Sequence, residues 1–115
     1  MYSIPFQVTD WATITPTIHQ GETGEARWRT WTQDGLRLRM VDYSPNYQAN
    51  HWCEKGHLLF VLEGEMITEL KDGKRFVMKA GTSYQVSDEL SSHRSYTKSG
   101  ARLIIIDGTF LKSTT

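Results

Sequence analysis

The sequence predicts an all-β protein in which antiparallel strands form a sandwich or a barrel. Two observations predict this class: apolar residues alternate with polar ones over short segments, and turn residues separate those segments throughout the 115-residue chain. Neighbouring side chains of a strand point to opposite faces, so a period of two indicates strands with one buried face. At most one short helical turn is expected, near residues 6–12, where Thr9 or Asp10 could cap it.

The first predicted hairpin joins strands at residues 27–31 and 36–40 across Asp34-Gly35. Asp-Gly between two alternating segments is a strong hairpin signal, because these residues tolerate the positive φ of a two-residue turn. In the second strand the apolar side chains share one face and the arginines the other: Leu36, Leu38 and Met40 against Arg37 and Arg39. The arginine face is therefore expected to face water.

A second hairpin is predicted across Asp72-Gly73, between strands at residues 65–70 and 75–79. The same alternation and the same turn dipeptide support it. Four further strands are expected, at residues 57–63, 82–86, 93–97 and 102–107. Many short strands at this spacing are typical of a sandwich or barrel.

Length, composition and charge limit the kinds of protein that this chain can be. A chain of 115 residues, 38% hydrophobic and 23% charged, is expected to fold as one globular domain. Its 13 basic and 13 acidic side chains cancel, so neither nucleic acid nor an anionic membrane is expected as a partner. No apolar run approaches the ~20 residues that cross a bilayer. The N-terminus carries no secretory signal pattern, so a cytoplasmic location is expected.

Metal-competent side chains gather near the middle of the chain, with one more towards its C-terminus. They comprise three of the four histidines and the lone cysteine: His51, Cys53, His57 and His93. Residues two apart on a strand share a face, and a reversal at residues 54–56 would return His57 beside Cys53. Imidazole and thiolate suit zinc, copper, nickel or iron. The alternative is a buried cysteine that acts as a small hydrophobe, with histidines at the surface.

The stretch from His51 to His57, continued through Gly64, resembles the first conserved motif of the cupin superfamily. His51 and Gly64 match the first histidine and the glycine of that motif. Cys53 stands at the second histidine, and His57 stands where a glutamate belongs. The segment at residues 80–84, followed by His93, resembles the second motif, with one extra residue and without its usual Pro-x-Gly.

This resemblance implies an antiparallel double-stranded β-helix, or jelly-roll barrel, spanning residues 1–115 as a single domain. Its N-terminal strands would occupy residues 1–46 and its metal-binding barrel core residues 47–107. The metal would be one divalent transition-metal ion on three histidines and Cys53, which favours zinc and leaves iron, nickel and copper open. More narrowly, the chain is similar to small cupin-fold proteins marked by an Asp/Asn-His-Trp-Cys stretch.

Three functions follow as hypotheses. The first is a metalloenzyme acting on a small organic molecule, as an isomerase, decarboxylase or oxygenase. The second is a non-catalytic binding or sensing module with a structural metal, since four protein ligands are typical of closed zinc sites. The third is a blue-copper electron-transfer site, which would need an axial methionine near His57.

Several neighbouring residues carry weaker expectations. Glu63 shares the strand parity of His57 and is the best candidate for a general base. Tyr84 could place its hydroxyl at the barrel mouth, whereas His19 is expected in an exposed loop. Cupins often dimerise, so a homodimer is expected, with tryptophans of an exposed sheet in the interface: Trp11, Trp28 and Trp31.

Overall fold

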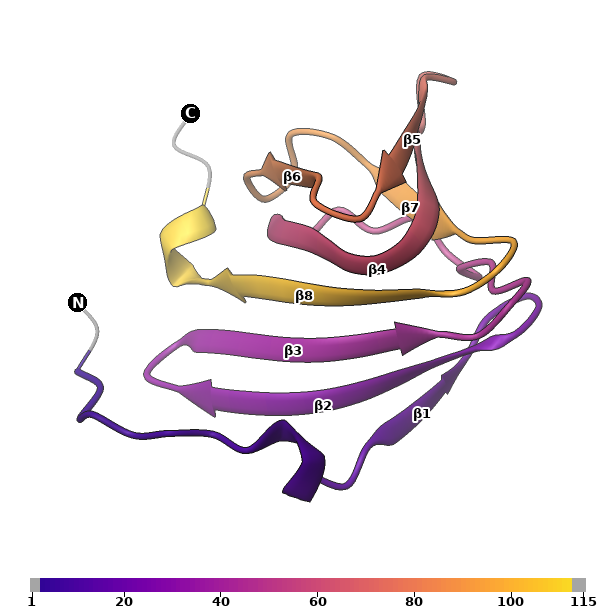
Figure 1. Cartoon of the computed structure of the whole chain (residues 1–115). Coiled ribbons are helices and arrows are strands. Elements are labelled where there is room, and N and C mark those ends of the chain that lie inside the picture. The colour runs from indigo at the N-terminus through magenta and orange to yellow at the C-terminus, as the bar shows by residue number, and fades with distance from the viewer. Residues whose placement is uncertain (1–2, 113–115) are drawn as a thin grey trace.

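The computed structural model describes residues 3–112, and its regular secondary structure is almost entirely β-strand, as predicted (Figure 1). The strands are β1 (Thr17–Gln20), β2 (Glu25–Gln33), β3 (Leu36–Tyr43), β4 (His57–Leu70), β5 (Arg75–Lys79), β6 (Ser83–Val86), β7 (His93–Tyr96) and β8 (Ala101–Gly108). Two short 3-10 helices, η1 (Trp11–Thr13) and η2 (Thr109–Leu111), flank them. No helix of the described residues is long and apolar enough to span a membrane.

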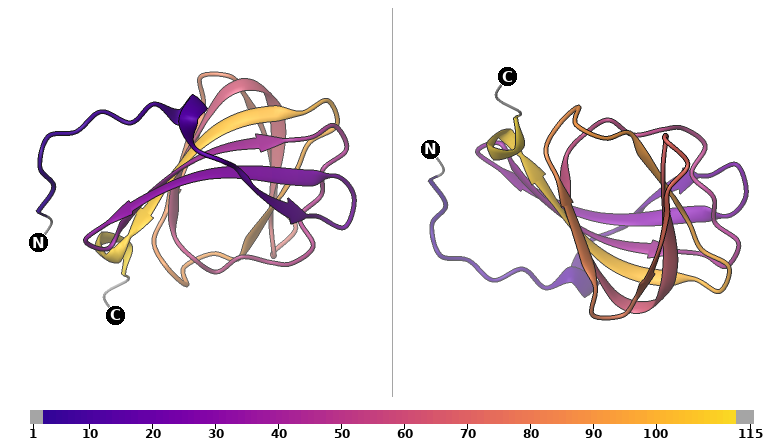
Figure 2. Two further views of the ribbon diagram at one scale, coloured as in Figure 1. Left: turned by 90° about the horizontal axis from the view of Figure 1, so that it is seen from below. Right: turned by 90° about the horizontal axis from the view of Figure 1, so that it is seen from above.

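The long strand β4 joins two antiparallel layers. Its first half pairs with β6 and β8, and its second half pairs with β5 and β7. The order β1-β2-β3-β8 continues the first layer away from β4. Figures 1 and 2 show the two layers closing around a common interior, with the N-terminal segment outside it. The strands expected at 57–63 and 65–70 are therefore one bent strand.

The bend in β4 exchanges which residues face the interior. The register against β8 shifts between Val61 and Glu63, so one extra β4 residue is accommodated as a β-bulge. Gly64 follows with φ of 79°, a conformation that favours glycine. Before the bulge the odd-numbered residues are buried, and after it the even-numbered ones. The expectation for Glu63 is therefore wrong: its side chain is exposed and pairs with Arg102 at 3.4 Å.

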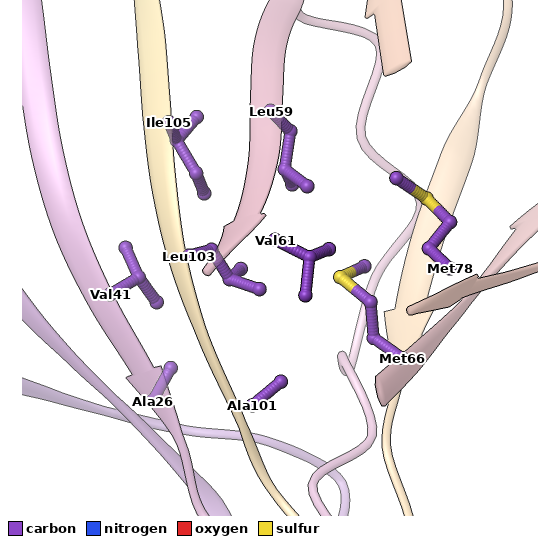
Figure 3. Close-up of a cluster of buried hydrophobic side chains, with 9 residues drawn as sticks. All are labelled: Ala26, Val41, Leu59, Val61, Met66, Met78, Ala101, Leu103 and Ile105. Carbon is purple, nitrogen blue, oxygen red and sulfur yellow. The ribbon is translucent and has the colours of Figure 1, made fainter. Parts of the chain in front are cut away.

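A cluster of nine buried apolar side chains fills the space between the two layers (Figure 3). Its members come from both halves of β4 and from four other strands: Ala26, Val41, Leu59, Val61, Met66, Met78, Ala101, Leu103 and Ile105. Figure 3 shows Met66 and Met78 facing the side chains of the opposite layer. This core occupies one part of the interior and leaves the other end to polar side chains.

Both predicted hairpins are confirmed. Asp34 and Gly35 link β2 to β3 with φ values of 50° and 78°, as a two-residue turn with two left-handed residues requires. Gly73, with φ of 97°, lies in the turn between β4 and β5. The helical turn also forms, as η1, and the Asp10 carboxylate caps it by accepting a hydrogen bond from Ala12 N at 3.1 Å.

Two expectations for the N-terminal half are wrong. His19 lies in strand β1, not in a loop, and its ring stacks on Trp28 with centroids 3.6 Å apart. The arginine face of β3 faces the interior, because Arg39 is only 4% exposed. Alternation identified the two faces of the strand but could not say which one was inside.

Candidate metal centre

Three of the four predicted ligands converge in space. The metal-binding atoms of Cys53, His57 and His93 all lie within 4.8 Å of one another. His57 begins β4 and His93 begins β7, whereas Cys53 lies in the loop segment before β4. Both histidines are buried and Cys53 is half-buried. The first half of β4 thus supplies one ligand and the strand paired with its second half supplies another.

The local route to this cluster differs from the expected hairpin. Cys53 does not turn back onto His57; it pairs with His93 through an isolated β-bridge. His57 is instead opposite Val86 of β6. The chain reversal between Cys53 and His57 is stabilised by long-range contacts, including a 2.6 Å hydrogen bond from Gly56 N to the Asp88 carboxylate. Spacing predicted that Cys53 and His57 lie close together, and tertiary pairing adds His93 to them.

The His93 ring is oriented as a metal ligand requires. Its Nδ1 lies 2.9 Å from the Ser91 carbonyl, which fixes the proton on Nδ1 as the donor. Its Nε2 is buried and has no hydrogen-bond partner among the described residues. A buried unpaired nitrogen costs free energy unless something satisfies it. A metal ion among these three side chains would satisfy it, so the residues present fit such an ion.

A buried carboxylate lies close to the His57 ring. The Asp107 Oδ2 atom lies 3.8 Å from His57 Nε2, and the Tyr84 hydroxyl lies 3.5 Å from His57 Nδ1. Ligating histidines commonly have a carboxylate or carbonyl partner that fixes the ring and raises its basicity. Asp107 is only 2% exposed and its pKa is lowered: burial alone would raise it, but hydrogen bonds from Arg37 and the charges of Arg39 and Arg37 outweigh burial. It therefore stays ionised.

The Cys53 thiol is poised as a thiolate. Burial alone would raise its pKa, but interactions with the His57 and His93 imidazoles and the Lys55 backbone lower that pKa to about 5. The pKa of His93 is raised in turn. Burial alone would lower it, but interactions with Cys53 and the Ser91 carbonyl outweigh burial. Thiolate is the form in which cysteine binds metals.

His51 stands apart from the cluster. It is exposed, and its Nδ1 lies 2.8 Å from the Asn50 side-chain oxygen. It does not belong to the group of donors that lie within 4.8 Å of one another, but it lines the same cavity. The structure thus brings three predicted ligands together and leaves the fourth at the wall of the same space.

The cluster opens onto a cavity of about 190 Å³ at the polar end of the interior. Besides the three clustered donors and His51, its wall includes aromatic and cationic side chains: Trp28, Tyr43, Tyr47, Tyr84, Arg37, Arg39, Lys55 and Arg94. Tyr84 thus lies at the cavity as expected. Trp52 does not line it and lies under Arg94, whose guanidinium carbon is 4.4 Å from the indole centroid.

Three residues of this region were missed by sequence reasoning: Trp28, Arg39 and Asp107. Arg39 Nη2 donates a 2.8 Å hydrogen bond to Asp107, and its guanidinium carbon lies 4.4 Å from the Trp28 centroid. A signal was present, because arginines alternate with apolar residues in β3 and an aspartate follows Ile104-Ile105-Ile106 in β8. Interpreting this signal requires the knowledge that β3 and β8 are neighbouring strands.

Comparison with known proteins gives fold similarity and no sequence match. No protein-family model matches the chain, and no curated protein matches it significantly. A predicted oxalate decarboxylase from Thermotoga maritima superposes with a TM-score of 0.74 at 17% identity, covering 89% of this chain and 99% of the other. An RmlC-like cupin from Shewanella frigidimarina has a TM-score of 0.70 at 18% identity, covering 90% and 91%.

The polyketide cyclase RemF from Streptomyces resistomycificus is also similar, with a TM-score of 0.74 at 17% identity over 90% of this chain and 80% of the other. Identities at this level establish the fold alone. They confirm the jelly-roll barrel that the motif resemblance implied, and the neighbours include enzymes.

Proposed function

Because the chain has the cupin fold, we propose that it binds one divalent transition-metal ion and acts as a metalloenzyme on a small organic molecule. Cys53, His57 and His93 are the core ligands of this proposal, and His51, exposed at the same cavity, is the candidate for a fourth. The donor set of one thiolate and imidazoles favours zinc, with iron, nickel and copper as the other candidates. The observation that carries the proposal is the buried, unpaired Nε2 of His93 within this cluster.

The number of close donors supports catalysis over a purely structural metal. Catalytic zinc sites commonly use three protein ligands and keep one position open, whereas structural sites use four. Three donors are clustered here, and His51 is exposed at the same cavity. When bound, such an ion supplies a Lewis acid that polarises a carbonyl or carboxylate group or acidifies a water. Isomerisation, decarboxylation and oxygenation are the reaction classes we propose.

The chain's own residues would bind and orient the substrate. Asp107 lies 3.8 Å from the His57 ring, and the half-buried Tyr84 hydroxyl lies beside that ring at the cavity wall. Burial raises the pKa of Tyr84, so its hydroxyl stays protonated and can donate a hydrogen bond to a substrate oxygen. The names of two structural neighbours, a predicted oxalate decarboxylase and a polyketide cyclase, are compatible with chemistry on small oxygenated molecules.

Elemental analysis tests the metal site directly. Protein purified without added metal or chelator should carry about one equivalent of zinc, iron, nickel or copper per chain. His93→Ala should lose the metal, and His19→Ala, which changes a histidine stacked on Trp28, should keep it. Metal-free wild type that stays metal-free after reconstitution would sink the proposal.

A non-catalytic binding or sensing module is the second candidate, favoured by the position of His51 at the cavity wall. If His51 closed the coordination sphere, the ion would stabilise the barrel and a small molecule would bind without being converted. Product analysis after incubation with candidate acids, aldehydes and sugars separates the two. Binding without turnover by the metal-loaded chain would favour the module.

Electron transfer receives no support from the cavity. No methionine is among the described residues that line it. Met66 and Met78 belong to the apolar cluster, and the Met78 sulfur accepts a 3.2 Å hydrogen bond from Thr68. A blue-copper site normally uses a weak axial methionine.

Homodimerisation stays a prediction, but the structure suggests other interface residues than the predicted tryptophans. Trp28 lines the cavity, so it is not available to an interface. The N-terminal segment instead exposes Phe6 by 95% and Val8 by 82%, apolar side chains that a second copy could cover. Sedimentation of the wild type and of a Phe6→Ser, Val8→Ser variant tests this, and a monomeric wild type would refute it.

A further inference from the structure

The polar end of the barrel interior contains a buried cation with few partners. Arg39 is 4% exposed, and of its five N–H groups only one, on Nη2, makes a hydrogen bond to a described residue. Its Nε is buried without a partner. Burying a guanidinium is costly unless charge and hydrogen bonds compensate it. The arrangement is therefore incomplete on its own and suited to a further anion.

The guanidinium is held rigidly in place. The Trp28 indole lies against it, with the Arg39 Cζ atom 4.4 Å from the ring centroid. The His19 ring in turn stacks on Trp28 at 3.6 Å. Cation–π stacking of this kind fixes the plane of the guanidinium, and a fixed fork binds a planar carboxylate in a preferred orientation. Arg39 is thus pre-positioned, unlike a flexible surface arginine.

The surrounding charges do not balance locally. The cavity wall contains four cationic side chains, Arg37, Arg39, Lys55 and Arg94, against the single Cys53 thiolate, with no aspartate or glutamate among the described residues. One buried carboxylate, Asp107, serves both Arg37 and Arg39, at 2.9 Å and 2.8 Å. Arg94 is paired with Glu69, whereas no described carboxylate pairs with Lys55. The cavity is therefore cationic and favours an anionic ligand.

Arg39 is also close to the candidate metal centre. The same Asp107 Oδ2 atom that accepts from Arg39 lies 3.8 Å from His57 Nε2. A short molecule could therefore reach both the guanidinium and the cluster. The cavity, at about 190 Å³, is smaller than the roughly 300–1,000 Å³ of pockets for drug-sized ligands. The ligand must accordingly be a small one.

We propose that the cavity takes a small carboxylic acid, whose carboxylate is bound by Arg39 while a second oxygen faces the Cys53–His57–His93 cluster. This inference names the substrate class of the proposed function and rests on it for the second oxygen. Arg37 and Lys55 line both the cavity and an adjoining surface groove, so they flank the way in. A planar carboxylate matches the arginine fork better than a neutral group of the same shape does.

Calorimetric titration of the zinc-loaded full chain tests the proposal, with malonate as the probe. Malonamide is its neutral analogue, and inorganic phosphate is the non-planar anion. Malonate should bind, malonamide should bind at least about tenfold more weakly, and Arg39→Gln should weaken malonate roughly 10- to 100-fold. The matched control is Arg102→Gln, which changes an arginine paired with Asp42 on the outer face, and it should bind malonate as the wild type does.

Zinc is measured in each sample after titration, so loss of metal is separated from loss of anion binding. Equal malonate affinity in wild type and Arg39→Gln would overturn the proposal, as would phosphate binding as tightly as malonate. If Arg39→Gln does not fold, Arg39→Lys replaces it: the charge stays, the fork is lost, and malonate affinity should still fall. Unchanged affinity in that variant would count against the fork.

A metal-free arm separates this inference from the proposed function. If the wild type binds no metal at all, the metalloenzyme proposal fails, and malonate is titrated into the metal-free chain. Arg39-dependent binding there would retain the anion site without a metal. Binding that does not depend on Arg39 would overturn the carboxylate anchor as well.

Discussion

The backbones of Cys53 and His93 are joined by two reciprocal hydrogen bonds, 2.8 Å from Cys53 N to His93 O and 3.0 Å from His93 N to Cys53 O. This bridge ties the loop before β4 to the first residue of β7. Two candidate ligands from distant parts of the sequence are thereby held at a fixed separation. A metal site assembled in this way is expected to be pre-organised before the ion binds.

Cys53→Ser should weaken zinc binding by more than ~100-fold, because changes behind a ligand already cost 10- to 100-fold and this one removes the thiolate itself. Chelator competition gives the affinities. His19→Ala is the control, since that ring stacks on Trp28 and lies outside the donor cluster. Equal losses in the two variants would contradict the assignment of Cys53 as a ligand.

The metal-free protein should show an unusually acidic thiol. With the Cys53 pKa at about 5, alkylation by iodoacetamide should be near its maximal rate from about pH 6 upward and fall as the pH drops through 5. An ordinary cysteine would lose its reactivity already below its usual pKa of about 8.5. His57→Ala should move the midpoint upward, because the imidazole no longer favours the thiolate. A midpoint above pH 8 in the wild type would refute the prediction.

The sequence predicted the strands and hairpins better than it predicted the interior. Asp34-Gly35 and Asp72-Gly73 are local signals, so both turns form where expected. The face of β3 that lies inside depends on its pairing with β8, and that pairing is not encoded locally. Arg39 therefore looked like a solvent-facing residue although it is buried.

The same limit explains what was missed around the metal centre. Cys53 and His57 were predicted to meet from their spacing, whereas His93 was singled out by its residue type and by the motif resemblance. Glu63 was misassigned because a β-bulge, invisible to a strict period of two, moves it to the outside of β4. Asp107 of β8 lies close to His57 of β4, and only the tertiary structure brings these strands together.

Asp107→Asn should destabilise the fold strongly. It leaves Arg37 and Arg39 without their shared buried carboxylate, and breaking a buried ion pair typically costs about 3–5 kcal/mol. Asp42→Asn is the matched control, because Asp42 also serves two arginines but sits in a partly exposed position, where pairs are worth up to ~1 kcal/mol. Urea unfolding of the metal-free proteins compares them. Similar midpoints for the two variants would contradict the buried character of the Asp107 site.

Gly64→Ala should destabilise more than Gly73→Ala. Both glycines have positive φ, 79° and 97°, so each alanine pays for a left-handed backbone at about 1–2 kcal/mol. A Cβ at Gly64 would also clash with the Gly100 carbonyl, adding roughly 1–3 kcal/mol of overpacking, whereas a Cβ at Gly73 meets nothing within 4 Å. Thermal unfolding distinguishes them, and equal Tm losses would argue against the tight bend at the β4 bulge.

Whether the proposed metal keeps an open coordination position depends on whether His51 is a ligand, and substitution of His51 tests this. Because it lies outside the cluster of three donors, His51→Ala should lower zinc affinity by less than about tenfold, while His93→Ala should lower it by more than about 100-fold. Chelator competition measures both. That outcome leaves three ligands and an open position, the arrangement a metalloenzyme needs. Equal losses would instead make His51 a full ligand and the site a four-ligand one, for which the binding or sensing module becomes the better account.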